Sequence, residues 1–218
     1  MTDQKRPYRM KRRAELEEQT RRRITESAVE LHGTLGPAQT SISAVAARAG
    51  VRRSTVYRHF PDEAALFAAC SSHWRAANPT PDVGRWAAIE DPGERLRASL
   101  AELYSHYRST EGMRVNLLRD EPRMPVLQRS LRRYRDYLDA ARDTLMAGRR
   151  LRGRARSRTR AAIGHALAFT TWRSLAREQG LDDAEAARLM ARLVEAAGPA
   201  RTGLGDGGLR AASPPPRG

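Results

Sequence analysis

Six side chains between residues 127 and 145 recur every three or four positions, a spacing that only an α-helix places on one face. They are Leu127, Leu131, Tyr134, Leu138, Ala141 and Leu145. Pro125 stands where proline is tolerated, in the first turn of such a helix. No stretch of useful length alternates apolar and polar residues as a half-buried strand does. The chain is therefore predicted to be all-α.

Capping and turn residues divide the rest of the sequence into further helices. Asp91-Pro92-Gly93-Glu94 combines an N-cap, a proline in the first turn and a carboxylate for the helix N-terminus. The helix it opens carries Leu96, Leu100, Leu103 and Tyr107 on one face, and a shorter element is expected around 113–118. Two more helices are predicted at 161–177 and 182–197, the second capped by Asp182 and Glu185.

Near the N-terminus, two very short helices flank a glycine. The first follows the candidate N-caps Thr40 and Ser41 and ends near Ala47, and the second covers 53–59. Gly50 between them permits the positive φ that such a turn often needs. A helix from about Ile24 to Leu35 precedes them. Three helices in this order predict a helix-turn-helix.

The charge of this region favours a nucleic-acid partner. The chain has 40 Lys and Arg against 25 Asp and Glu, a formal net charge of +15. Residues 31–61 contain no acid, although Arg48, Arg52, Arg53 and Arg58 lie among them. An acidic side chain would repel phosphate, so an acid-free face suits DNA. No run of about 18 apolar residues is present that could span a membrane.

The stretch from Arg22 to Leu66, RRITESAVELHGTLGPAQTSISAVAARAGVRRSTVYRHFPDEAAL, resembles the DNA-binding domain of TetR-family transcriptional regulators. The family pattern of a small residue, Gly and Val, followed by Thr, an aliphatic residue, Tyr, any residue, His and Phe, is met by 49–51 and 55–60. The resemblance implies a sequence-specific regulator of double-stranded DNA, usually a repressor, that acts as a homodimer on a pseudo-palindromic operator. The remaining helices resemble in length and arrangement the family's regulatory domain, which implies a small-molecule effector.

The resemblance also assigns roles to residues. Thr40, Ser41, Thr55, Tyr57 and His59 match positions that contact phosphates, and Arg52, Arg53 and Ser54 open the recognition helix, where we expect base contacts. Arg58 is expected to reach a base or a phosphate. One position departs from the pattern: the family usually has Lys three residues after Phe60, and here that residue is Glu63. The expected phosphate contact at that position is lost, and Arg52 and Arg53 are a hypothetical compensation.

Apolar and aromatic residues of the second domain are candidates for a ligand pocket, although such stripes more often form core. Tyr104, His106, Tyr134 and Tyr137 offer polar groups and rank first, and Phe169 and Trp172 are further candidates. Residues 148–160 are predicted to be a charged loop, with seven arginines between Arg149 and Arg160. That run is either a solvated loop or a second anion contact. The helices at 161–177 and 182–197 are predicted to pair with their symmetry mates in the dimer.

The predicted organisation is a flexible basic arm (1–12), a three-helix DNA-binding domain (13–61), a helical ligand-sensing and dimerisation domain (62–197) and a disordered tail (198–218). No motif for catalysis, a cofactor or a metal is present, so we expect a protein that is not an enzyme. A single cysteine, Cys70, fits a reducing, cytoplasmic setting. Two alternatives remain open: a nonspecific architectural DNA-binding protein, and a DNA-binding appendage on an uncharacterised enzyme domain.

Overall fold

The computed structural model describes residues 5–198, and within them every regular element is helical, which confirms the all-α prediction. The α-helices are α1 Lys5–Thr34, α2 Ile42–Arg48, α3 Arg53–His59, α4 Glu63–Ala77, α5 Val83–Ala87, α6 Pro92–Asp120, α7 Pro125–Met146, α8 Gly153–Ala166, α9 Phe169–Arg173 and α10 Asp183–Ala196. Short 3-10 turns lie at Pro37–Gln39 (η1) and Glu121–Arg123 (η2), and a π-helical turn (η3) covers Ser174–Glu178. The predicted tail from 199 onward and residues 1–4 lie outside the described residues.

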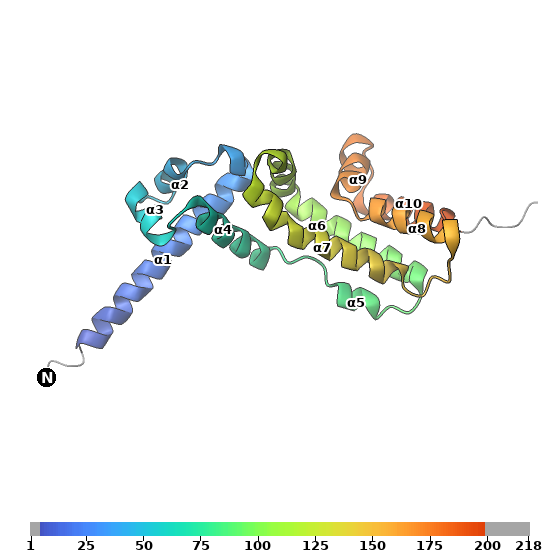
Figure 1. The fold of residues 1–218 in the computed structure, drawn as a ribbon, viewed down its shortest axis with the longest axis horizontal. Helices are drawn as coiled ribbons and strands as arrows, with labels where there is room; N and C mark the ends of the chain where they lie inside the picture. Colours follow the sequence, from blue (N-terminus) through green and yellow to red (C-terminus); the bar gives the residue numbers. More distant parts are fainter. Residues whose placement is uncertain (1–4, 199–218) are drawn as a thin grey trace, which may run out of the picture.

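The molecule is elongated, with a small N-terminal helical unit at one end and the larger unit at the other (Figure 1). The N-terminal core joins α1, α2, α3 and the first half of α4. Its fully buried members include Ile24 of α1 and the pair Val56 and Phe60 at α3. Leu66 and Cys70 of α4 belong to the same core, so the N-terminal unit extends past the predicted boundary at 61.

The second core is formed by α5 to α10, with α6 and α7 as its long parallel axes in the view of Figure 1. Leu96, Leu100 and Leu103 of α6 are completely buried, as the spacing predicts. The Asp91 cap accepts a hydrogen bond from the Glu94 N–H at 2.6 Å. At α10, Asp182 and Glu185 form the predicted capping box.

The structure corrects the predicted flexible arm at 1–12, because α1 already begins at Lys5. The segment is rich in Lys and Arg, which favour helix, and contains no glycine. Its one proline, Pro7, lies in the first turn, where a missing N–H loses no helical hydrogen bond. Figure 1 shows this part of α1 projecting beyond the N-terminal unit.

Three predicted boundaries in the second unit are also wrong. The separate element at 113–118 is part of α6, which continues to Asp120 through Gly112, where that helix packs closely against Gly33 of α1. The predicted loop at 148–160 is mostly helix, because α8 begins at Gly153. The single helix predicted at 161–177 is interrupted at Ala168, whose backbone is extended.

The interruption near Ala168 has a tertiary cause. The carbonyl oxygens of Ala166 and Leu167, which the end of α8 leaves without helical partners, accept hydrogen bonds from Tyr104 (2.9 Å) and Tyr107 (2.5 Å). Both tyrosines come from α6 and are fully buried. Two hydroxyl groups from a distant helix therefore stabilise this helix end, where neither glycine nor proline follows the last residue.

The two units are joined by α4 and by hydrogen bonds from the end of α6 to the last turn of α1 and the loop after it. Asn116 donates to the main-chain oxygens of His32 (3.1 Å) and Gly33 (2.8 Å). Arg119 donates to the Leu35 oxygen at 2.7 Å. Asp120 accepts from the Ala38 N–H at 3.0 Å. We call Asn116, Arg119 and Asp120 the α6 latch.

Candidate DNA-binding surface and effector cavity

The turn between α2 and α3 has the geometry of a helix-turn-helix. Gly50 has φ +62°, as its position in the sequence predicts. The Val51 N–H donates to the Ala46 oxygen at 3.0 Å, which closes the turn after α2. Val45, Ala46 and Ala49 are buried between the helices, and their small size allows the close approach.

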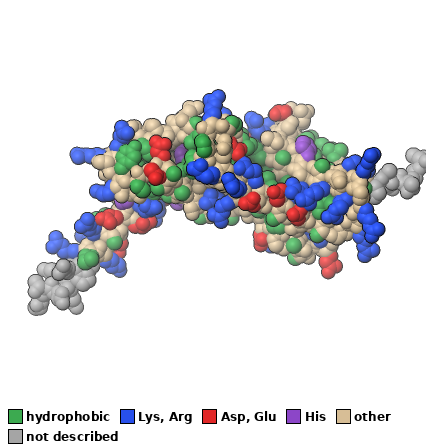
Figure 2. All heavy atoms as spheres, viewed as in Figure 1, with side chains coloured by type: hydrophobic (Ala, Val, Ile, Leu, Met, Phe, Trp, Pro, Cys, Tyr) green, Lys and Arg blue, Asp and Glu red, His purple; other side chains and the backbone are tan. Residues whose placement is uncertain are grey.

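Helix α3 presents one face to solvent and anchors the other in the core. Val56 and Phe60 are each 1% exposed. Arg52, Arg53, Ser54 and Arg58 are exposed, and none of these side chains makes a hydrogen bond or ion pair with a described residue. Figure 2 shows basic side chains protruding at the end of the molecule that α2 and α3 form. These guanidinium groups are available to an external anion.

The predicted phosphate-contacting residues differ in what they can offer. Ser41 caps α2 by accepting from the Ala44 N–H at 3.1 Å, which leaves its own proton free to donate. The Thr40 hydroxyl instead donates to the Gly36 oxygen at 2.8 Å, so its proton is already used. Tyr57 is 43% exposed and Thr55 is half-buried.

His59 is the most constrained member of the set. Its Nε2 is buried and has no hydrogen-bond partner among the described residues, so only Nδ1 is left for a phosphate. Partial burial, followed by the nearby charges of Arg58 and Arg21, lowers the pKa of His59. Arg21 donates to the His59 main-chain oxygen at 2.8 Å and lies 4.4 Å from the Phe60 ring centre. This role of Arg21 was not predictable from the sequence, because one basic residue among many gives no distinguishing signal.

Glu63, which replaces the expected lysine, is exposed at the start of α4. The preceding Asp62 caps that helix by accepting from the Ala65 N–H at 2.7 Å. Both carboxylates suit the positive end of the helix dipole. They stabilise α4 and supply no cation at this point of the surface.

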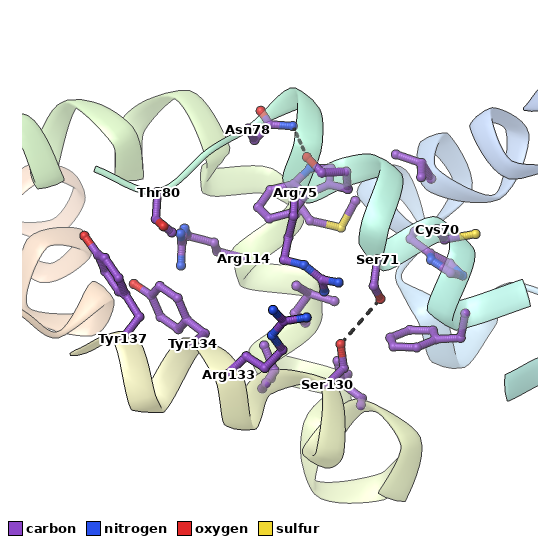
Figure 3. Close-up of a pocket in the computed structure, with 18 of the residues that line it drawn as sticks. Cys70, Ser71, Arg75, Asn78, Thr80, Arg114, Ser130, Arg133, Tyr134 and Tyr137 are labelled. Carbon is purple, nitrogen blue, oxygen red and sulfur yellow. Dashed lines mark hydrogen bonds between the residues drawn. The ribbon is translucent and has the colours of Figure 1, made fainter. Parts of the chain in front are cut away.

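A cavity of about 350 Å³ lies between the two cores and is lined by α1, α4, α6 and α7 (Figure 3). Its apolar wall includes Phe67, Trp74, Met113, Leu117 and Leu131. Three arginines also line it: Arg75 from α4, Arg114 from α6 and Arg133 from α7. No Asp or Glu is among the lining residues. The volume is at the low end of the range of small-molecule sites.

Two of the six predicted ligand residues, Tyr134 and Tyr137, line this cavity. The other four do not. The rings of Tyr104, Phe169 and Trp172 are packed in the second core, where Trp172 donates to Asp183 at 2.8 Å. His106 contacts Arg114 behind the cavity wall, and burial lowers the pKa of His106 to about 4.

The cavity arginines could not be singled out from sequence. Arg133 flanks the apolar face of α7 in the run LRRYRDYLD, where any of the arginines fits a solvated helix face equally well. The arginine-rich run at 149–160 was a more conspicuous candidate for an anion contact in the sequence. Its arginines nevertheless do not form one anion site. Arg149 donates to the Pro92 oxygen at 2.9 Å, and Arg160 pairs with Asp143.

Cys70 lines the cavity and is 2% exposed, and burial raises the pKa of its thiol to about 12. A thiol with so little thiolate is unreactive at neutral pH. Among the described residues, no group of three or more His, Cys, Asp or Glu side chains could hold a metal ion. None of the described helices combines the length and apolarity needed to span a membrane.

Comparison with known proteins identifies the N-terminal unit. Residues 24–70 match the family described as "Bacterial regulatory proteins, tetR family". No curated protein matches the chain. The family resemblance seen in the sequence is therefore confirmed for the helix-turn-helix unit.

Solved structures share the fold of most of the chain. A TetR-like transcriptional regulator from Rhodococcus sp. RHA1 is 19% identical, with a TM-score of 0.59 over 81% of this chain and 94% of that one. A tetR-family transcriptional regulator from Streptomyces coelicolor is 18% identical, with a TM-score of 0.57 over 83% and 80%. The transcriptional regulator FadR from Bacillus subtilis, in complex with stearoyl-CoA, is 17% identical, with a TM-score of 0.55 over 79% and 96%. Residues 24–70 thus match the TetR family model, and the fold is similar to that of solved TetR-family transcriptional regulators.

Proposed function

We propose that the protein is a dimeric transcriptional regulator that binds one operator specifically and responds to a small-molecule effector. The observation that carries the proposal is the outer face of α3. Three arginines and a serine there are exposed and have no partners among the described residues, while Val56 and Phe60 fix the helix in the core. Exposed guanidinium groups on a rigid helix suit bidentate contacts to guanine in the major groove.

Dimerisation is supported by the outer face of α10. Leu189 and Leu193 are one helical turn apart and are 38% and 52% exposed. Met190 and Val194, on the other face of α10, are buried. Two adjacent exposed leucines on an ordered helix favour packing against a symmetry-related copy, which would place two α3 helices on one pseudo-palindrome.

The effector response is supported by the position of the cavity. Arg75 and Phe67 belong to α4, whose first half is part of the DNA-binding core. Met113, Arg114 and Leu117 lie on α6 next to the latch residues that hold the loop after α1. The complex of FadR with stearoyl-CoA is a second line of support, since that protein shares this fold. An effector that binds one arrangement of α4 and α6 better than another would shift the DNA-binding equilibrium.

Selection of DNA from a random library, followed by affinity measurements over a salt series, tests the proposal. We expect one enriched palindromic sequence that binds more tightly than random DNA by about 10³-fold or more. Its affinity should fall with salt, while the preference over random DNA should persist. Equal affinity for all sequences at every salt concentration would instead support a nonspecific architectural protein.

A further inference from the structure

Arg114 is a buried cation whose charge is not neutralised by any described carboxylate. Arg114 is 8% exposed and forms no ion pair in the described part of the chain. Its Nε donates to Thr110 at 2.8 Å, and its Nη2 lies 2.8 Å from Nε2 of His106. The guanidinium also lies 4.5 Å from the Tyr134 ring centre and 4.9 Å from that of Tyr107. These contacts leave the N–H groups of Nη1 available.

A second buried arginine, Arg95, has a hydrogen-bond partner for each of its three guanidinium nitrogens. Arg95 is 6% exposed and donates to the main-chain oxygens of Ile89, Glu90, Thr144 and Ala147, at 2.8 to 3.1 Å. Arg95 therefore acts as a structural tie between segments. Arg114 has two hydrogen bonds and lines a cavity, so a partner for its charge has room to bind.

A hydroxyl group at the same end of the cavity also has no partner. The Tyr137 hydroxyl oxygen is buried and makes no hydrogen bond with any described residue. Figure 3 shows Tyr134 and Tyr137 side by side, with the Arg114 guanidinium and Thr80 close to them. A buried hydroxyl without a hydrogen bond costs free energy, which a bound acceptor would recover.

The remaining cations of the cavity add to its positive field. Arg75 and Arg133 extend toward each other from opposite walls (Figure 3), and neither forms an ion pair or hydrogen bond with a described residue. Burial, and then the charge of Arg133, lowers the pKa of Arg75, which reflects their proximity. A bound anion would relieve this repulsion, and the wall formed by Phe67, Trp74 and Leu131 would contact an apolar group.

We propose that this cavity binds a small organic anion with an apolar body, whose carboxylate or phosphate group pairs with Arg114 and accepts a hydrogen bond from Tyr137. Arg75 and Arg133 attract the anion and hold it between α4 and α7. The effector class of the proposed regulator is then an amphipathic anion, and this last statement alone rests on the proposed function.

Calorimetry on the full chain without DNA tests the proposal with four probes that share an eight-carbon chain: octanoate, octyl phosphate, 1-octanol and octyltrimethylammonium. We expect at least one of the two anions to bind more tightly than the alcohol and the cation, by about tenfold. Whether octanoate or octyl phosphate binds more tightly distinguishes a carboxylate from a phosphate ligand. Equal affinity for all four probes, or no binding of either anion, would overturn the proposal.

Variants assign the effect to residues. Tyr137→Phe removes only the unpartnered hydroxyl, so it should weaken binding of the anion by about fivefold without lowering the melting temperature of the free protein. Arg133→Gln should weaken it as well, whereas Arg132→Gln, the same charge change one residue away and outside the cavity lining, should not. Arg114→Gln should abolish the preference for anions. If Arg114→Gln does not fold, the first three variants still decide the matter, because unchanged affinity in Tyr137→Phe and Arg133→Gln refutes the site.

Failure here is distinguishable from failure of the proposed function. Anion binding with no specific DNA binding would leave the cavity assignment intact and refute the regulator. Specific DNA binding without a preference for anions would support the regulator and refute the cavity assignment.

Discussion

The carboxylate of Asp120, at the last residue of α6, accepts a hydrogen bond from the main-chain N–H of Ala38, 82 residues earlier in the chain. Asp120 is 5% exposed and is also bound by Arg119 at 2.7 Å. That hydrogen bond from Arg119, and then the one from Ala38, lowers the pKa of Asp120 despite its burial. A single side chain thus connects the cavity-lining helix α6 to the segment that leads into α2.

Removal of this carboxylate should destabilise the junction of the two units. Asp120→Ala leaves the Ala38 N–H without its acceptor, so we expect the free energy of unfolding to fall by about 1–3 kcal/mol. Asp120→Asn keeps an acceptor oxygen, so its free energy of unfolding should fall by less than that of Asp120→Ala. Urea denaturation measures both, and wild-type stability in Asp120→Ala would contradict the assigned role of the latch.

The same junction should not tolerate a side chain at Gly36. This residue has φ +94°, and a Cβ there would collide with the side chains of Arg119 and Asp120. In Gly36→Ala, backbone strain should lower the free energy of unfolding by about 1–3 kcal/mol. The collision should lower it further. Gly50→Ala is the matched control, since Gly50 also has positive φ but no atom within 4 Å of a Cβ. The difference between the two melting temperatures isolates the collision from the strain.

Two substitutions on α3 separate base recognition from phosphate binding. Arg53→Ala should relax the preference at one base pair of the operator by about 1–3 kcal/mol. Tyr57→Phe should weaken binding to all sequences alike, because a phosphate contact carries no sequence information. Binding assays on a set of single-base operator variants measure both effects. An unchanged base preference in Arg53→Ala would show that Arg53 does not recognise a base.

Dimer formation should depend on the exposed leucines of α10. Leu193→Asp places a charge at the centre of the proposed interface, so sedimentation should show a shift from dimer to monomer. Leu118→Asp is the control, because Leu118 of α6 is 42% exposed and lies outside α10. If both variants remain dimers, the interface lies elsewhere.

Stability should fall on mild acidification because of His32. Burial lowers the pKa of His32 to about 4, against the charge of Asp120, which raises it. The unfolded chain therefore binds more protons than the folded one between pH 6.5 and 4, so stability is complete above this window and is lost as the pH falls through it. We expect a loss of up to about 2 kcal/mol from this residue between pH 7 and 5. His32→Gln should show a smaller difference between unfolding curves at these two pH values, and an identical difference would refute the assignment.

The helix-turn-helix was predictable because its determinants are local. Gly50 allows the turn, Ser41 caps α2, and the spacing of Val56 and Phe60 selects the buried face of α3. Each depends on residues within a few positions of one another. For the same reason, the N-cap at Asp91 and the capping box at Asp182 predicted the starts of α6 and α10 correctly.

The candidate effector cavity was only partly predictable, because it is built from side chains on four separate helices. The sequence pointed to Tyr134 and Tyr137, whose polar tips lie on a regular apolar face. It also pointed to Phe169 and Trp172, which are chemically similar but lie within the core. Aromatic side chains on an apolar face fit both settings, and periodicity alone does not distinguish a cavity wall from a packed core.

The sequence by itself determined the helical class, the DNA-binding unit and its exposed basic face, because those properties follow from local periodicity, capping and charge. Only the tertiary structure decided where α8 ends, since the hydroxyls of Tyr104 and Tyr107 come from a helix about 60 residues away. It also decided which arginines matter: Arg95 is satisfied by four carbonyl groups, whereas Arg114 faces a cavity with its charge unpaired. The two are alike in sequence, and they differ because the free energy of a buried charge depends on the groups that surround it in space.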